Sequence, residues 1–165
     1  MKVRNVWTLL LFGAVISCDG GLAPPERAEG PPYLTGLITY RNWPPADSIL
    51  DLRLVLFKNF PPGDIVSEVL SGRAVVHPPI GDTSLVPFFV DSLRYGFTAA
   101  AGNYAYLVVA QQFGPDVRAD WRAVGQYDLD SDPSIPTPLT LADGDTTREI
   151  NIAVDFANPP PTPFR

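Results

Sequence analysis

The stretch Tyr104-Ala-Tyr-Leu-Val-Val-Ala-Gln-Gln112 decides the fold of this 165-residue chain. Tyrosine, valine and leucine dominate it, and these residue types favour extended backbone. Both of its alternating faces are apolar for part of its length, so other parts of the protein must cover it on both sides. We therefore predict that residues 104–112 form a central strand, which ends at Phe113-Gly-Pro115.

Shorter strand patterns flank this stretch. Residues 50–58 alternate clearly, with Leu52, Leu54 and Leu56 on one face. Proline- and glycine-rich turns separate the segments, and no segment longer than about ten residues shows a helical period. These features predict an all-β fold, a two-sheet sandwich of about seven strands. The other candidate strands are residues 33–41, 65–70, 73–77, 85–91 (an edge, because of Pro87), 94–98, 121–127, 139–141 and 149–156.

The first eighteen residues follow a different pattern. Lys2 and Arg4 precede an uncharged apolar run, residues 6–16, which is shorter than the roughly 20 residues that a membrane-spanning helix needs. The run ends in Val15-Ile16-Ser17-Cys18, which resembles the lipobox of bacterial lipoprotein precursors. The resemblance implies a signal peptide over residues 1–17, cleavage before Cys18 and lipid on the Cys18 thiol. The alternative is an ordinary secretory signal with a cysteine at its cleavage site.

The rest of the chain divides into three parts. Residues 18–32 are rich in glycine, proline and charge, and predict a flexible tether between the lipid and the body. Residues 33–156 form the predicted sandwich domain, and residues 157–165 form a proline-rich tail. A lipid on Cys18 would attach the protein to a membrane of the bacterial cell envelope, on the periplasmic side or at the cell surface.

The charge of the mature chain limits its partners. Removal of residues 1–17 takes away Lys2 and Arg4 and no acidic residue, so the formal net charge changes from −6 to −8. Nucleic acids are bound mainly through basic side chains that contact phosphate, so this acidic balance argues against a nucleic-acid partner.

Several motifs of the body resemble one family of β-sandwiches. They are Thr35-Gly-Leu-Ile-Thr-Tyr40, Leu52-Arg-Leu-Val-Leu-Phe57, Ala101-Gly-Asn-Tyr104 with the strand that follows, Trp121–Tyr127, and the segment from Gly144-Asp145 to Ile152. They resemble the transthyretin-like domains, also called carboxypeptidase-regulatory-like domains, which are common on bacterial surface lipoproteins. The resemblance implies a seven-stranded, immunoglobulin-like arrangement in two sheets and a non-catalytic module. It does not extend to hormone binding. We expect a structural or protein-interaction role with an envelope protein partner.

The acidic motif Asp128-x-Asp130-x-Asp132 is a candidate metal site. Oxygen ligands at alternate positions suit Ca²⁺, because a loop can curl them around one ion. However, Pro133 stands where a calcium-binding EF-hand loop has its glycine, and the twelfth position is Leu139 instead of glutamate. The alternative is a solvated acidic loop that joins two strands.

Aromatic residues offer a second candidate site. Trp43, Trp121 and Tyr127 are the candidates for an exposed platform that stacks on a glycan or a peptide. Trp43 stands out because it lies beside Pro44-Pro45 in a turn. The alternative is that these rings pack in the core, as tryptophan commonly does in sandwiches. A small-ligand module that binds glycan or Ca²⁺ is therefore the second functional hypothesis.

No motif predicts an enzyme. The chain has no Gly-x-Ser-x-Gly nucleophile motif, and its one cysteine is assigned to the lipid. The one histidine, His77, precedes Pro78-Pro79 at the end of a candidate strand, where we expect a surface role. We predict no catalytic residues and no cofactor apart from the possible Ca²⁺.

Overall fold

The structure is a computed structural model that describes residues 29–82 and 86–163. The predicted signal peptide, the lipidation site Cys18 and most of the predicted tether lie outside these residues. The described part holds two short helices, η1 (Ala46–Ser48) and α1 (Ile65–Leu70). Its strands are β1 (Tyr33–Arg41), β2 (Asp51–Phe57), β3 (Ala74–His77), β4 (Ser92–Thr98), β5 (Gly102–Tyr104), β6 (Tyr106–Gln112), β7 (Trp121–Gln126), β8 (Leu139–Leu141), β9 (Thr146–Thr147) and β10 (Ile152–Asp155).

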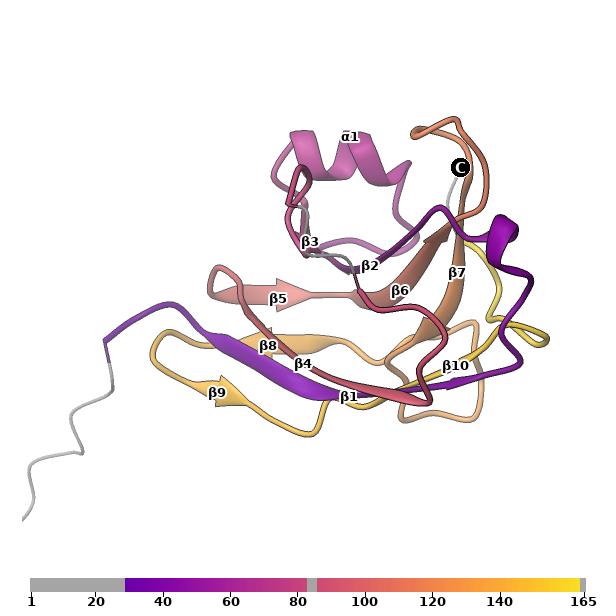
Figure 1. The fold of residues 1–165 in the computed structure, drawn as a ribbon. Coiled ribbons are helices and arrows are strands. Elements are labelled where there is room, and N and C mark those ends of the chain that lie inside the picture. The colour runs from indigo at the N-terminus through magenta and orange to yellow at the C-terminus, as the bar shows by residue number, and fades with distance from the viewer. Residues whose placement is uncertain (1–28, 83–85, 164–165) are drawn as a thin grey trace, which may run out of the picture.

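The strands form one large mixed sheet and one small sheet (Figure 1). The large sheet has the order β3-β2-β6-β7-β10-β1-β4, and β9 also pairs with β1. Most of its pairings are antiparallel, but β1 is parallel to both β10 and β9. Strands β5 and β8 pair separately. The coarser part of the fold prediction is confirmed: the described body is mostly β, because strands far outnumber helices.

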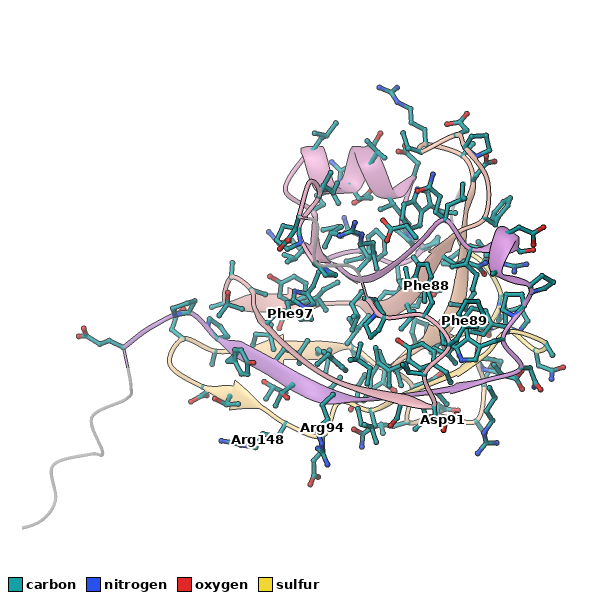
Figure 2. All side chains as sticks on the ribbon, viewed as in Figure 1. Phe88, Phe89, Asp91, Arg94, Phe97 and Arg148 are labelled. Carbon is teal, nitrogen blue, oxygen red and sulfur yellow. The ribbon has the colours of Figure 1, made fainter. Side chains whose placement is uncertain are left out.

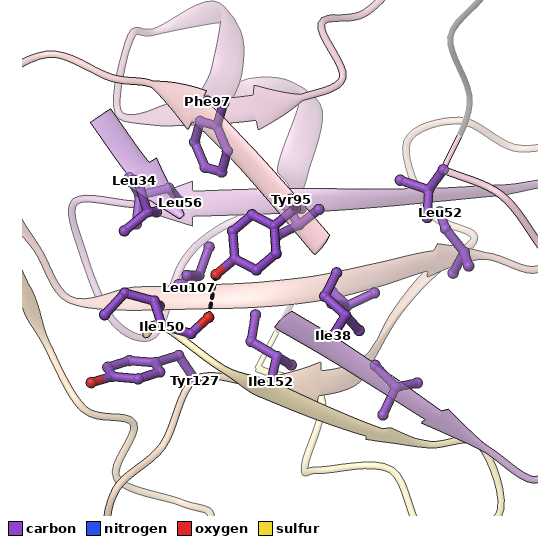
Figure 3. Close-up of a cluster of buried hydrophobic side chains, with 14 of the residues drawn as sticks. Leu34, Ile38, Leu52, Leu56, Tyr95, Phe97, Leu107, Tyr127, Ile150 and Ile152 are labelled. Atoms are coloured by element: carbon purple, nitrogen blue, oxygen red, sulfur yellow. Dashed lines mark hydrogen bonds between the residues drawn. The ribbon is translucent and has the colours of Figure 1, made fainter. Parts of the chain in front are cut away.

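The large sheet curls around the main hydrophobic core. Inward-facing side chains from strands across the whole sheet meet in that core, which Figure 3 shows for β1, β2, β4, β6 and β10. At the two edges of the sheet, His77 of β3 stacks on Phe97 of β4 with ring centroids 4.9 Å apart. The two edge strands therefore lie close to each other. The small sheet adds Tyr104, Leu139 and Leu141 to the same core.

Strand β6 is central, as its sequence predicts. It pairs with β2 on one side and β7 on the other, and every residue from Tyr106 to Gln111 is buried. Leu107 and Val109 face the main core. Tyr106, Val108 and Ala110 face the opposite way, into a second apolar cluster. The double burial explains why both faces of this segment are apolar.

Helix α1 covers that second cluster, and here the sequence-based prediction was wrong. Residues 65–70 were expected to form a strand, because Ile65, Val66 and Val69 favour extended backbone. They form a helix because the Asp64 carboxylate accepts a hydrogen bond from the Ser67 N–H at 2.9 Å and caps the first turn. Ile65 is buried against the outer face of the sheet.

A second local prediction also failed. Residues 85–91 were expected to form an edge strand, but residues 86–91 form a loop before β4. In this loop Val86 is buried in the main core. The other expected strands are present, but two differ in extent: the segment 104–112 is divided at Ala105, with Tyr104 in β5 of the small sheet, and the segment 149–156 is shortened to β10. Among the described residues, no helix is long and apolar enough to cross a membrane.

Candidate functional site

The outer face of the large sheet carries an apolar pocket, which we name the α1 pocket. It lies between helix α1, the loop after β3 and the loop that joins β6 to β7, and its volume is about 260 Å³. Its floor comes from four neighbouring strands. The lining residues are Asp51, Arg53, Ile65, Val66, Val76, Ile80, Gln112, Val117 and Trp121. A mostly apolar hollow with a few polar groups is the usual form of a small binding site.

The floor holds one buried ion pair. Asp51 and Arg53 occupy alternate positions of β2, on the face that Val55 and Phe57 continue beneath the helix. Arg53 Nε donates to Asp51 Oδ2 at 2.6 Å, and the two side chains are only 10% and 16% exposed. The pair is therefore largely shielded from water, where an ion pair is retained only if it is well hydrogen-bonded.

Arg53 also holds one wall of the pocket in place. Its Nη1 donates to the carbonyl oxygen of Pro78 at 2.9 Å and to that of Pro79 at 3.3 Å. These bonds fix the loop that carries Ile80, whose side chain is 66% exposed at the pocket rim. The other oxygen of the floor carboxylate, Asp51 Oδ1, is buried and has no hydrogen-bond partner among the described residues.

The helix wall is fixed by a second ion pair. Arg73 donates to both carboxylate oxygens of Glu68, from Nε at 2.9 Å and from Nη2 at 3.1 Å. This guanidinium holds the pKa of Glu68 below its usual range. Glu68 also accepts from the Gly63 N–H at 3.3 Å. The start and the end of α1 are thus tied together, so Ile65 and Val66 keep their positions in the wall.

The third wall is the loop from Phe113 to Asp120. Trp121 Nε1 donates to the carbonyl oxygen of Val117 at 2.9 Å, so the indole ring and Val117 form one unit. Asp116 accepts from the Arg118 N–H at 2.8 Å, and Asp120 accepts from the Asp116 N–H at 2.8 Å. Side-chain acceptors therefore order this loop, although it has no regular secondary structure.

The opposite side of the molecule is polar. Arg94 and Arg148 extend into solvent from the side of the sheet that carries β1, β4 and β9 (Figure 2). They line an open, shallow hollow together with Glu149 and Asn151. The apolar α1 pocket and this charged hollow therefore lie on different sides of the sheet.

The three aspartates of the candidate metal site act as turn acceptors. Asp128 Oδ1 accepts from the Asp130 N–H, Asp130 Oδ1 from the Asp132 N–H, and Asp132 Oδ1 from the Ser134 N–H, each at 2.9 Å. The bonds from Ser134 hold the pKa of Asp132 below its usual range. Within the described part of the chain, no group of three or more histidine, cysteine or acidic side chains is arranged to hold a metal ion.

The three aromatic candidates lie in different surroundings. Trp43 packs against the main core, stacks on Tyr40 with centroids 4.8 Å apart, and donates from Nε1 to the Val90 carbonyl at 3.0 Å. Tyr127 is 7% exposed and also belongs to the main core. Trp121 lies on the outer face, in the wall of the α1 pocket. The structure thus brings only Trp121 into the apolar pocket.

Sequence reasoning missed the charged floor of this pocket. Asp51 and Arg53 were visible as charges within a strand, but exposed positions of a half-buried strand are usually charged. The distinguishing signal was that Val55 and Phe57 share their face. A strand face that is charged in one half and apolar in the other is covered by another element only over its apolar half. A pocket can form where that covering element ends.

No protein-family model matches this chain, no curated protein matches its sequence, and no solved structure matches its fold.

Proposed function

We propose that this chain is a lipid-anchored lipoprotein of the bacterial cell envelope, with a non-catalytic domain that holds a protein partner at the α1 pocket. Val15-Ile16-Ser17-Cys18 supports the anchor. The curled sheet around the main core supports a transthyretin-like sandwich as the finer description of the fold. The observation that carries the binding role is an open apolar pocket whose rim exposes further apolar side chains.

The rim favours a protein over a free small molecule. Ile80 is 66% exposed and Val117 is 57% exposed, and both line the pocket. A small ligand inside the pocket would leave this surrounding surface in water. A protein partner would cover it, and the covered rim would exclude water from the central contact.

The position of the pocket suits an anchored protein. Strand β1 begins at Tyr33, and the strand pairings put the start of β2, the end of β6 and the start of β7 at the opposite end of the sheet. Asp51, Gln112 and Trp121 of the pocket lie there. A tether that enters at Tyr33 would leave the pocket pointing away from the membrane, within reach of a partner.

The anchor is tested by metabolic labelling of the full-length protein in bacteria with an alkyne-tagged palmitate. We expect label on the protein and its recovery with membranes, and loss of both in Cys18→Ala. Label that persists in Cys18→Ala, or membrane recovery that is unchanged, would contradict the anchor.

The binding role is tested by photo-crosslinking in the same cells. A photoreactive amino acid at Val117 should give one discrete adduct, identified by mass spectrometry as the same envelope protein that is crosslinked from Ile80. The matched control is Leu129, which is 78% exposed in the acidic loop. Equal crosslinking from Leu129, or none from the two rim positions, would refute the role.

A further inference from the structure

Strand β4 is an open edge of the large sheet. Within the described residues it pairs only with β1 (Figure 1), over seven residues and without a register shift. The strand at the other edge, β3, has four residues and is followed by Pro78-Pro79. Proteins keep edge strands short, bulged or interrupted by proline, because an open edge can pair with another chain. Strand β4 has none of these three protections.

The hydrogen bonds to β1 show which main-chain groups of β4 point away from the sheet. The Tyr40 N–H donates to the Asp91 carbonyl at 2.9 Å, and the Ala99 N–H donates to the Pro32 carbonyl at 3.3 Å. In an antiparallel pair, residues that exchange such bonds alternate with residues whose N–H and C=O point outward. The outward residues are Ser92, Arg94, Gly96 and Thr98. No described residue is hydrogen-bonded to the main chain of these four.

The open part of this edge ends before Phe97. The Phe97 ring stacks on His77 of β3 with centroids 4.9 Å apart, so the two edges of the curled sheet touch there. A strand added to β4 would therefore pair with residues 92–96. Along this part, Arg94 lies in the middle and its side chain is exposed.

A hollow beside residues 93–96 gives an added strand room for its side chains. It lies between β4, the end of β3 and the loop after β3, and its volume is about 330 Å³. A cavity of roughly 150 Å³ can bind benzene, so this hollow has room for two medium-sized apolar side chains. Successive side chains of a strand point to opposite faces, so the two neighbours of a central residue would both enter it. The apolar lining residues are Leu54, Pro78, Val86, Pro87 and Leu93.

The outer face of this edge is positively charged. Arg94 and Arg148 line one hollow there (Figure 2), and Glu149 is the one acidic residue among its lining side chains. Neither guanidinium forms an ion pair within the described part of the chain. Side chains directly opposite each other on paired strands are neighbours on one face. An acidic residue opposite Arg94 would therefore gain an ion pair.

We infer that residues 92–96 of β4 accept an extended segment of another protein, with an acidic residue opposite Arg94 and an apolar residue on each side of it. A second copy of this chain fits poorly. A symmetric pairing of residues 92–96 would place Arg94 directly opposite Arg94 of the other copy, and like charges in that position are destabilising. In strand addition, main-chain hydrogen bonds provide affinity and alternate side chains provide specificity. This surface is separate from the α1 pocket, so the inference does not rest on the proposed function.

The test uses the mature lipidated protein in nanodiscs of zwitterionic lipid and two peptide probes, acetyl-Thr-Val-Glu-Val-Thr-amide and its counterpart with lysine in place of glutamate. The readout is hydrogen exchange of single main-chain N–H groups, measured by NMR. The Arg94 and Gly96 N–H groups should exchange rapidly in the free protein, whereas Tyr95, which pairs with Gly36 of β1, should exchange slowly.

The glutamate probe should protect the outward groups. We expect a Kd on the order of 1 mM, because a short flexible peptide loses conformational freedom when it binds. At a peptide concentration of about ten times the Kd, exchange at Arg94 and Gly96 should slow by about tenfold, because only the unbound protein exchanges these protons. Binding of the probe without this protection would overturn strand addition. Slow exchange at both positions in the free protein would show that the chain itself covers the edge, and would also overturn it.

The charge of the probe tests the role of Arg94. The lysine probe should bind roughly threefold more weakly or less tightly still, since it replaces an ion pair by a repulsion. Arg94→Glu should reverse this preference. Arg118→Glu makes the same charge change at an exposed position in the loop after β6 and should leave it unchanged. Equal affinity of the two probes, or the same reversal in Arg118→Glu, would overturn the acidic specificity. Protection of Arg94 that grows with protein concentration in the absence of peptide would assign the edge to a second copy and overturn the choice of partner.

Discussion

Three buried tyrosines provide a test of the structure. Replacement by phenylalanine should lower the free energy of unfolding at one of them and raise it at the other two. Tyr95 donates its hydroxyl to the Ile150 carbonyl at 2.6 Å, and this bond joins β4 to the segment before β10 (Figure 3). The hydroxyls of Tyr40 and Tyr106 are also buried, but neither has a hydrogen-bond partner in the described part of the chain. Burial raises the pKa of all three phenols, so each remains protonated at neutral pH.

The change to phenylalanine removes only the hydroxyl. In Tyr95→Phe the buried Ile150 carbonyl loses its donor, which costs about 1–3 kcal/mol of unfolding free energy. In Tyr40→Phe and Tyr106→Phe the removed hydroxyl is one that folding buries away from water without giving it a hydrogen bond in return. These two variants should therefore be more stable than the parent, by about 1 kcal/mol each.

The assay is urea unfolding of the unlipidated mature protein, followed by tryptophan fluorescence. All variants should keep the slope of the parent, because the area exposed on unfolding does not change, and only the midpoint should move. The Tyr40→Phe and Tyr106→Phe effects should add in the double variant, because Tyr40 faces the main core and Tyr106 faces the outer cluster. Midpoints that fall by similar amounts in all three single variants, or a neutral Tyr95→Phe, would refute the assignment of paired and unpaired hydroxyls.

Three further outcomes follow from other parts of the fold. Gly36→Ala should lower the free energy of unfolding by about 3 kcal/mol or more in the same urea assay, because the new methyl group would overlap the Ile150 carbonyl oxygen on the neighbouring chain segment. A variant as stable as the parent would contradict the close approach of these two segments. Asp64→Ala should lose about 1 kcal/mol through the lost cap of α1, and restoration by Asp64→Ser would separate capping from charge. Burial lowers the pKa of His77, so the unfolded chain binds a proton at this residue more readily than the folded chain does. The free energy of unfolding should therefore fall as pH drops below about 6.5. A His77→Phe protein whose stability has the same pH profile would show that His77 is not the cause.

Much of the strand pattern could be predicted, because the cause is local. The alternation of Leu52, Leu54 and Leu56 reports a face that meets the core, and the doubly apolar run after Tyr104 reports burial on both faces. These features depend on the side-chain period of a strand, which the order of residues contains directly. The same reasoning failed at residues 65–70, where the Asp64 cap and the Glu68–Arg73 ion pair outweigh the strand preference of Ile65.

The candidate site required long-range information. Asp51, Val66 and Val117 belong to a strand, a helix and a loop, and only the packing of α1 on the outer face brings them around one cavity. No periodicity encodes that distance, because it depends on how far the helix covers the sheet. For the same reason the sequence could name Trp121 as a binding candidate but could not separate it from Tyr127, which the fold turns into the core.

The sequence by itself determined a mostly-β body and a central strand within residues 104–112, observed as β6 (Tyr106–Gln112), because these follow from residue types and from the strand period. It also supplies the lipobox pattern that ends at Cys18, on which the proposed anchor rests. Only the tertiary structure decided that β1 runs parallel to β10, that the sheet curls until His77 meets Phe97, and that an apolar pocket opens beside a buried ion pair. The physical reason is that these features arise from contacts between segments far apart in the chain, whose free energies depend on packing and desolvation and not on local preference.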